Sequence, residues 1–232
     1  MFQALNIHTL TYEQLAKTMD HSILPPDLTE ADVIVQLELA MRYNVAAVAV
    51  KPCELPLAVS VLRGSGVNAG VTVGFPHGVN TTATKAFEAE DALNSGATEL
   101  DMVINVGKLR AGKLDYVRDD IKAVVDVAKG RAIVKVIIEI AYLTNEQKVT
   151  ACKLVEEAGA DFVKNSSGYA PSGYTIEDLK LMRASVSPQV RVKASAGVRT
   201  LDAALAVIEV GCVRIGTIAS AVILDEFARR QA

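Results

Sequence analysis

Cysteine, histidine and tryptophan are scarce in this chain of 232 residues, which has three cysteines, three histidines and no tryptophan. Cys53, Cys152 and Cys212 are odd in number, far apart and in no metal-ligand pattern. We therefore expect free thiols in a reducing cytoplasm. With so few histidines, a histidine-rich zinc site is not expected either. The sequence predicts a protein without a metal site.

An excess of positive charge and long apolar runs are also missing. The 24 Lys and Arg residues are scattered among 27 Asp and Glu residues, so a nucleic-acid surface is not expected. The most apolar stretch, residues 132–143, is interrupted by Lys135 and Glu139 and is too short to cross a bilayer. The amino terminus shows no basic segment followed by an apolar run, as a signal peptide would. We expect a cytoplasmic protein without nucleic-acid or membrane partners.

Half of the residues are apolar, and they recur without a linker or low-complexity break. Short apolar runs occur at about residues 16–20, 46–50, 69–74, 99–104, 133–140, 161–164, 190–194 and 212–216. Stretches with helical spacing lie between them, such as residues 28–43 and 81–93, and Thr144 begins a capping box with Gln147. This alternation is typical of strands and helices that build a parallel sheet.

The eight strand–helix units average about 29 residues, which is the size of one βα unit. We therefore predict an α/β fold in which residues 16–232 close into a (β/α)₈ TIM barrel. Residues 1–15 are predicted to form an extra N-terminal helix that covers the barrel bottom. A doubly wound open sheet is the alternative, which is disfavoured because no Gly-x-Gly-x-x-Gly follows the first strand.

Two lysines end consecutive apolar runs, and small hydroxyl and glycine residues follow each of them. Lys164 precedes Asn-Ser-Ser-Gly, and Lys193 precedes Ala-Ser-Ala-Gly. A buried ammonium needs a partner or loses its proton, and a neutral lysine is a nucleophile towards carbonyl groups. Either lysine alone would more often extend to solvent. The repeated arrangement favours chemistry.

An aspartate on the fourth predicted strand is the natural partner of these lysines. Alternation puts Glu99, Asp101 and Val103 on one face of this strand, and the other face is apolar throughout. Asp101 is therefore predicted to face the lumen, near the strand ends where barrel active sites lie. One aspartate and two lysines in a dry pocket fit Schiff-base catalysis. A structural cluster of ion pairs fits the spacing equally well.

Other polar residues near predicted strand ends are weaker candidates. His21 and His77 are more often structural, hydrogen-bonded histidines, although either suits acid–base catalysis. Asp20 either positions a water molecule or caps a loop. Cys53 would be reactive only beside a cation, and an unreactive surface thiol is the simpler interpretation.

Five motifs are spread along nearly the whole predicted barrel. They are MDHSILPP (19–26), VGFPHG (73–78), ATELDMVINVG (97–107), DFVKNSSG (161–168) and VKASAG (192–197). In content, order and spacing they resemble the deoxyribose-phosphate aldolase family of class I aldolases. The lysine motif in its strand–loop context is the most specific of the five.

The resemblance implies a (β/α)₈ barrel that reversibly cleaves 2-deoxy-D-ribose 5-phosphate into glyceraldehyde 3-phosphate and acetaldehyde, without a metal or organic cofactor. Lys164 matches the Schiff-base lysine, Lys193 the second lysine that keeps the first deprotonated, and Asp101 the acid/base aspartate. Asp20 matches a supporting aspartate, and Ser22 stands where a threonine is usual. The resemblance also implies a small-molecule sugar phosphate and aldehydes as partners, and a homodimer.

The chain departs from the family pattern in the loops expected to bind phosphate. The family's paired glycines after strand seven become Ala196-Gly197, and its Gly-Thr-Ser-Ser after strand eight becomes Gly-Thr-Ile-Ala. Residues expected to bind substrate, partly through backbone N–H groups, are Ser22, Ser167, Gly168, Gly197, Thr217 and Ser220. The altered loops predict weaker discrimination between the phosphorylated and unphosphorylated sugar.

Two alternatives remain open at this point. One is a Schiff-base aldolase that uses a different or unphosphorylated aldehyde acceptor. The other is a barrel that binds a sugar phosphate without turnover. The second is disfavoured because Asp101, Lys164 and Lys193 are all present.

Overall fold

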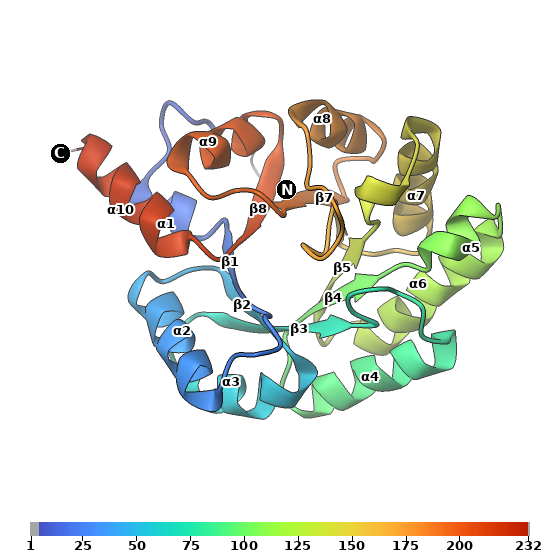
Figure 1. Ribbon diagram of the computed structural model, residues 1–232, viewed down its shortest axis with the longest axis horizontal. Coiled ribbons are helices and arrows are strands. Elements are labelled where there is room, and N and C mark those ends of the chain that lie inside the picture. The colour runs from blue at the N-terminus through green and yellow to red at the C-terminus, as the bar shows by residue number, and fades with distance from the viewer. Residues whose placement is uncertain (1–4, 232) are drawn as a thin grey trace.

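The chain forms a closed barrel of parallel strands in sequence order, and the computed structural model describes residues 5–231 of it (Figure 1). The strands are β1 (Met19–Ile23), β2 (Ala47–Val50), β3 (Asn68–Val73), β4 (Glu99–Val103), β5 (Ile133–Ile137), β6 (Phe162–Lys164), β7 (Arg191–Ser195) and β8 (Cys212–Thr217). β8 pairs with β1, which closes the sheet. The predicted (β/α)₈ barrel is confirmed, and the doubly wound alternative is wrong.

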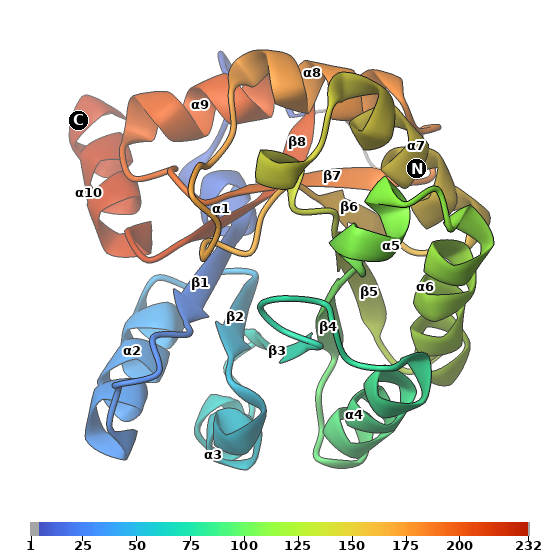
Figure 2. The same cartoon turned by 45° about the vertical axis from the view of Figure 1, so that its right-hand side comes forward.

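Helices surround the barrel on its outer side (Figures 1 and 2). They are α1 (Tyr12–Ala16), α2 (Glu30–Arg42), α3 (Leu55–Leu62), α4 (Thr82–Asn94), α5 (Val106–Arg110), α6 (Leu114–Ala128), α7 (Asn145–Glu157), α8 (Ile176–Ala184), α9 (Leu201–Glu209) and α10 (Ser220–Gln231), with 3₁₀ turns η1 (Pro52–Glu54) and η2 (Ile140–Tyr142). Parallel neighbours cannot be joined by a tight hairpin, and the helices supply the crossovers between them.

Threonine ends many of the loops that lead into these helices. The N-cap residues of α2, α4, α7, α8 and α9 are Thr29, Thr81, Thr144, Thr175 and Thr200. Each side chain accepts a hydrogen bond from a backbone N–H in the first turn, which satisfies a donor that the helix leaves unpaired. The capping box predicted at Thr144 is present.

The amino-terminal segment differs from the prediction of a helix over residues 1–15. Among the described residues this helix is limited to α1, which begins after the N-cap Thr11, and residues 1–4 lie outside the described part. Because α1 extends to Ala16, β1 begins at Met19, three residues later than the apolar pattern predicts. The first strand therefore begins later than predicted because the capping box starts a helix just before it.

The predicted fifth strand is too long at its carboxyl end. β5 ends at Ile137, whereas the apolar run extends to residue 140. Glu139 adopts a left-handed backbone conformation with φ 54°, which ends the extended chain and starts η2. The other predicted strands agree with the structure to within one residue at each end.

The segment before β1 lies at the end of the barrel where the strands begin. Leu5 and Gln14 line a cavity of about 390 Å³ there, together with Asn68, Phe162 and Arg214. α1 also packs against α10. This segment therefore borders the lower mouth of the barrel, while the division of the chain at residue 16 into a helix and a barrel stays a prediction.

The barrel interior is charged, whereas the layer between strands and helices is the apolar core. On β4, Leu100 and Met102 belong to that core and are fully buried. Glu99 and Asp101 alternate with them and face the lumen, as predicted, and there both contact Lys135 on β5. Barrels usually fill their lumen with branched apolar side chains. A charged lumen therefore points to function rather than packing.

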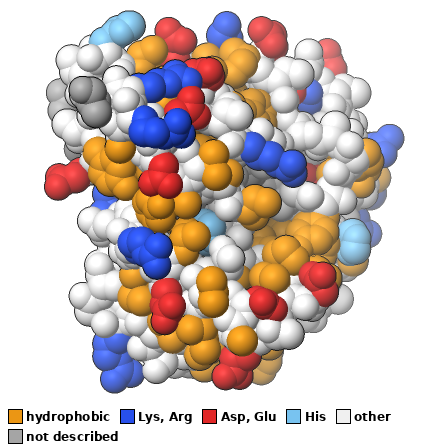
Figure 3. Space-filling model, turned by 60° about the vertical axis from the view of Figure 1, so that its left-hand side comes forward, with side chains coloured by type: hydrophobic (Ala, Val, Ile, Leu, Met, Phe, Trp, Pro, Cys, Tyr) orange, Lys and Arg blue, Asp and Glu red, His pale blue; other side chains and the backbone are white. Residues whose placement is uncertain are grey.

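Residues 5–231 contain no group of three or more His, Cys, Asp or Glu side chains arranged to hold a metal ion. No helix in this range has both the length and the apolar character needed to cross a membrane. On the face shown in Figure 3, positive and negative side chains are interspersed. The predicted free thiols are confirmed, with Cys53 exposed and Cys152 and Cys212 buried.

Candidate active site

The strand register sets the charged residues of the lumen beside one another. Lys164 on β6 is the register partner of Lys193 on β7, and Lys193 is the partner of Arg214 on β8. Asp101 on β4 is likewise paired with Lys135 on β5. Register partners lie about 5 Å apart across a sheet. Adjacent cations at this spacing need carboxylates between them.

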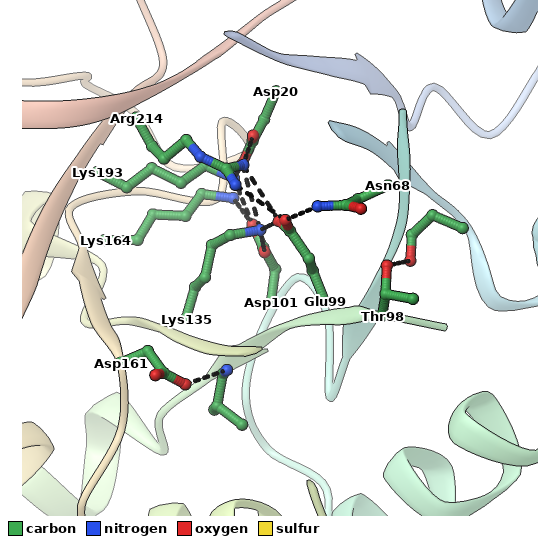
Figure 4. Close-up of polar contacts among 12 residues, drawn as sticks. Asp20, Asn68, Thr98, Glu99, Asp101, Lys135, Asp161, Lys164, Lys193 and Arg214 are labelled. Carbon is green, nitrogen blue, oxygen red and sulfur yellow. Dashed lines mark hydrogen bonds and ion pairs between the residues drawn. The ribbon is translucent and has the colours of Figure 1, made fainter. Parts of the chain in front are cut away.

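Asp101 contacts both of the predicted lysines (Figure 4). Its Oδ2 accepts hydrogen bonds from Lys164 Nζ at 2.7 Å and from Lys193 Nζ at 2.8 Å. Lys193 Nζ also lies 2.5 Å from Asp20 Oδ2. All four side chains are buried. The predicted meeting of one aspartate and two lysines is confirmed, and Asp20 joins them.

Further ion pairs extend this cluster across the lumen. Lys135 Nζ lies 2.5 Å from Glu99 Oε2 and 2.9 Å from Asp101 Oδ1. It also lies 3.2 Å from Asp20 Oδ2. Arg214 binds Glu99 at 2.9 Å and pairs with Asp20 as well. Each of the three carboxylates therefore contacts at least two cations.

The carboxylates stay ionised although they are buried. Burial raises the pKa of Asp101, but the three ammonium groups around it, of which Lys135 acts most strongly, lower it well below its usual value. At Asp20 burial is likewise outweighed, because Lys135 and two further cations hold the pKa low. Both groups are therefore anions throughout the neutral pH range.

Lys164 differs from the other lysines in its surroundings. Burial, aided by the nearby Lys193 ammonium and opposed by Asp101, lowers the pKa of Lys164 to about 8. Burial also acts on Lys135, but three carboxylates contact that ammonium and raise its pKa above the usual value. Lys164 is thus partly neutral near neutral pH, and a neutral amine is the form that adds to a carbonyl group.

Lys164 also lines a cavity of about 350 Å³ at the carboxyl ends of the strands. Part of its wall is apolar and consists of Leu24, Pro25 and Pro26, and the loops after β6, β7 and β8 form much of the rest. The hydroxyl of Tyr169 donates to the carbonyl of Leu24 at 2.9 Å, which joins two sides of the rim. The volume suits a small molecule. This is the face where barrel enzymes bind substrates.

Most of the predicted substrate-binding residues line this cavity. They are Ser22, Ser167, Gly168, Gly197 and Thr217. The hydroxyl of Thr217 donates to the carbonyl of Val198 at 2.6 Å, so this group already has a protein partner. Gly168 and Gly197 present backbone to the cavity, and their φ values of 96° and 134° favour glycine.

Ser220 is the exception among the predicted substrate-binding residues. It is fully buried, and its Oγ lies 3.0 Å from His21 Nδ1. His21 Nε2 lies 2.8 Å from Gln36 Oε1 on α2. His21 is therefore a structural histidine, as the sequence favours. The Ser220 hydroxyl serves His21 instead of the cavity, because His21 points away from the lumen while its neighbour Asp20 points into it.

Asn165 fastens the loop after Lys164 to the end of β7. Its Oδ1 accepts a hydrogen bond from the backbone N–H of Ser195 at 2.7 Å, and its Nδ2 donates to the Ser195 carbonyl at 2.9 Å. Ser195 Oγ also donates to the carbonyl of Ser166 at 2.6 Å. These bonds fix the end of β6, and with it the backbone of Lys164.

Sequence reasoning misses Arg214 and Arg199. An arginine inside the apolar run at residues 212–216 is as anomalous as the two lysines, so this signal was available for Arg214. Arg199 is exposed and lines the cavity, where it adds positive charge to a wall built largely of small residues. Nothing in the local sequence distinguishes Arg199 from a surface arginine.

Comparison with known proteins identifies the group to which this site belongs. Residues 14–219 match the family described as DeoC/LacD family aldolase. The deoxyribose-phosphate aldolase of Clostridium perfringens (strain 13 / Type A) is 49% identical over 213 residues, which are 92% of this chain and 95% of that protein. The chain belongs to the DeoC/LacD family of aldolases.

Further relatives of this DeoC/LacD aldolase agree in sequence and fold. The deoxyribose-phosphate aldolase of Enterococcus faecalis is 50% identical over 203 residues, 88% of this chain and 92% of that protein. The crystal structure of a putative deoxyribose-phosphate aldolase from Coccidioides immitis superposes with a TM-score of 0.91 at 35% identity, covering 98% of this chain and 88% of that one. The aldolase from Aeropyrum pernix gives 0.87 at 29% identity, covering 94% and 92%.

Proposed function

We propose that this aldolase reversibly cleaves 2-deoxy-D-ribose 5-phosphate to D-glyceraldehyde 3-phosphate and acetaldehyde through a Schiff base on Lys164. The position of Lys164 carries this conclusion: it is buried at the end of β6, lines the cavity and is paired with a single carboxylate. Relatives that are 49% and 50% identical over most of the chain are named for this activity.

The reaction begins when Lys164 Nζ adds to the C1 aldehyde of the open-chain sugar. The carbinolamine loses water, and the resulting protonated imine draws electrons from the C2–C3 bond. When the 3-hydroxyl group gives up its proton, this bond breaks, glyceraldehyde 3-phosphate leaves and an enamine stays on Lys164. Protonation of the enamine at C2 and hydrolysis of the imine release acetaldehyde and restore the amine.

Asp101 and Lys193 move the protons in these steps. The two ammonium groups share Asp101 Oδ2, so a proton leaving Lys164 has an acceptor at 2.7 Å and a second ammonium beyond it at 2.8 Å. Lys193 also keeps the pKa of Lys164 low. Asp20 orients Lys193 through the 2.5 Å ion pair. Only side chains of this chain enter the proposed steps, without a metal or organic cofactor.

The substrate phosphate lies against the loops after β6, β7 and β8. Gly168, Gly197 and Thr217 supply backbone N–H groups there, a common means of binding phosphate in barrels. Arg199 supplies a positive charge at the same wall. Ser22 lines the same cavity and offers a hydroxyl to the sugar.

An aldolase that accepts the unphosphorylated sugar nearly as well is the second candidate. Ile218 is 60% exposed and lines the cavity, so apolar bulk stands where a hydroxyl donor is expected. The hydroxyl groups of Thr217 and Ser220 are bound to Val198 and His21. We therefore expect turnover of both sugars, with a smaller preference for the phosphorylated one than in relatives that keep two serines in this loop.

Borohydride trapping tests the proposed chemistry. Reduction in the presence of 2-deoxyribose 5-phosphate or acetaldehyde should attach the adduct to Lys164, located by peptide mass mapping. The exposed Lys122 is an internal control that should stay unlabelled in the same digest. A label on Lys193 would show that Lys193, and not Lys164, forms the Schiff base. An active enzyme without any label would rule out a Schiff-base mechanism. Absence of turnover with the sugar phosphate would show that 2-deoxyribose 5-phosphate is not the substrate.

The same enzyme is cytoplasmic and self-associates as a homodimer. Its three unpaired thiols support a reducing compartment. The relative from Aeropyrum pernix is described as tetrameric, so at least one protein of this fold assembles from several subunits. Analytical ultracentrifugation at micromolar concentration tests this point, and a monomer under those conditions would contradict it.

A further inference from the structure

Seven ionisable side chains share the lumen, and their charges do not cancel (Figure 4). Four are basic and three are acidic: Lys135, Lys164, Lys193, Arg214, Asp20, Glu99 and Asp101. β2 contributes no ionisable group, and β3 contributes the amide of Asn68, which donates to Glu99 at 2.8 Å. If every group were ionised, the buried cluster would carry one surplus positive charge.

A surplus charge inside a barrel is unfavourable, because the interior solvates it poorly. Loss of one proton from one lysine removes the surplus. The contacts single out Lys164, which reaches one carboxylate, whereas Lys193 reaches two and Lys135 reaches three. Lys164 is therefore the ammonium that the cluster holds least firmly.

Arg214 differs from the lysines because a guanidinium does not lose its proton in proteins. Its ion pairs go to Asp20 and Glu99, and its side chain borders the cavity at the lower mouth of the barrel. The residues that line the substrate cavity do not include it. Without Arg214, three lysines would face three carboxylates, and the cluster would be neutral with Lys164 protonated.

We propose that Arg214 is a positioning residue whose permanent charge keeps Lys164 in its neutral, nucleophilic form. Arg214 occupies oxygens of Asp20 and Glu99 from the lower side, so these carboxylates have less capacity left for the lysines. Lys135 and Lys193 contact the remaining oxygens of these carboxylates. Lys164 contacts only one oxygen of Asp101, which it shares with Lys193. This role rests on the proposed function, since Lys164 is taken as the amine.

Two further cations lie on the side of Arg214, whereas Arg199 and the buried Glu139 lie on the side of the substrate cavity. Arg191 and Lys17 line the same lower cavity. Arg191 pairs with Asp161 at 3.5 Å, and its guanidinium carbon lies 3.9 Å from the centre of the Phe162 ring. Both cations repel Arg214. Lys17 therefore adds positive potential from below in the same direction as Arg214, while Asp161 offsets the charge of Arg191.

A purely structural role for Arg214 would give a different experimental result. If Arg214 only held β8 to β1 and β4, its removal would lower stability and activity in the same proportion at every pH. If its charge sets the protonation of Lys164, removal shifts the pH dependence, and the direction of the shift follows the sign of the charge removed. Glu99, the direct partner of Arg214, provides the opposite sign at the same place.

The test compares Arg214→Met, Glu99→Gln and the double variant, with Arg214→Lys as the control of equal charge. Two pH profiles are measured, kcat/KM with the sugar phosphate and the rate of borohydride trapping with acetaldehyde. In Arg214→Met the acid limb should move to higher pH by about one unit or more, as expected for loss of a nearby charge. Glu99→Gln should move it to lower pH, and the double variant should return it towards the wild type.

The outcomes separate this inference from the proposed function. If wild-type protein turns over the sugar but the single variants keep its pH profile, the role of Arg214 is overturned and the aldolase stands. If wild-type protein shows neither turnover nor trapping, the proposed function itself fails. Circular dichroism verifies the fold of each variant. Should Arg214→Met not fold, absence of a downward shift in Glu99→Gln overturns the inference.

Discussion

Lys164 and Lys193 share one oxygen atom, Oδ2 of Asp101, which lies 2.7 Å from the first ammonium nitrogen and 2.8 Å from the second. The register of β6 and β7 makes the two lysines direct neighbours, so one carboxylate stands between two like charges. Repulsion between the ammonium groups favours loss of a proton from one of them, and the shared oxygen provides its first acceptor. In the proposed mechanism, activation of the amine and proton transfer therefore both involve this one oxygen atom.

Asp101→Asn should lower turnover by about 10²–10⁴-fold, the range for general acid–base steps. The amide keeps the size of the side chain but removes the charge that both lysines contact. Steady-state kinetics with 2-deoxyribose 5-phosphate measure the effect. Asp126→Asn is the matched control, because its exposed pair with Lys122 lies on the outer face of α6 and should leave turnover unchanged. Equal losses in both variants would contradict a special role for Asp101.

Lys193→Leu should move the acid limb of the pH–rate profile to higher pH. The pKa of Lys164 is about 8, so its neutral form grows as the pH rises through that value. The Lys193 ammonium helps to lower this pKa, and its removal therefore raises it. The kcat/KM profile between about pH 6 and pH 10 measures the shift, in a range that brackets this pKa. An unchanged profile would contradict the electrostatic coupling between the two lysines.

Arg199→Met should reduce kcat/KM for the phosphorylated sugar by about tenfold or more, since hydrogen bonds to charged groups contribute about 1.5–3 kcal/mol. The unphosphorylated sugar should be turned over as before, because it offers no anion to Arg199.

Both sugars are assayed side by side, together with a relative that has Gly-Gly and Ser-Ser in its phosphate loops. A preference for phosphate in this protein as large as in that relative would show that the altered loops do not matter.

Ala196→Gly should leave stability unchanged or raise it by up to about 1.5 kcal/mol. Ala196 has φ 65°, a left-handed conformation that costs a non-glycine residue about 1–2 kcal/mol. Glycine removes this strain and adds about 0.4–1 kcal/mol of unfolded-state entropy. Urea unfolding measures the net change. The control Ala228→Gly, at an exposed position inside α10, should lose about 0.5–1 kcal/mol. Equal losses in both variants would mean that Ala196 is not strained.

The barrel can be predicted from the repeated alternation of strands and helices. The central residues can be predicted because each of them breaks a local pattern. Lys164 and Lys193 stand at the ends of apolar strands, and Asp101 occupies the polar face of a strand whose other face is apolar. Strand alternation is a property of neighbouring residues, so it can be read from the chain alone. The depth of Asp101 in the lumen and its meeting with the lysines follow from that alternation and the parallel order of strands.

Other features depend on contacts between distant segments. Asp20 and Arg214 meet only because β8 pairs with β1, and they lie at opposite ends of the chain. The hydroxyl of Ser220 turns to His21 because α10 begins beside the outer face of β1. No periodicity in the sequence reports either relationship. The same holds for Thr217, whose hydroxyl has a partner in the preceding loop.

The pairing of β8 with β1 also means that the barrel is closed by the strand that is made last. A ribosome delivers β1 first and β8 last, so Arg214 reaches Asp20 only when synthesis is nearly complete. The last strand therefore completes both the wall of the barrel and, in the role proposed for Arg214, the charge that keeps Lys164 neutral.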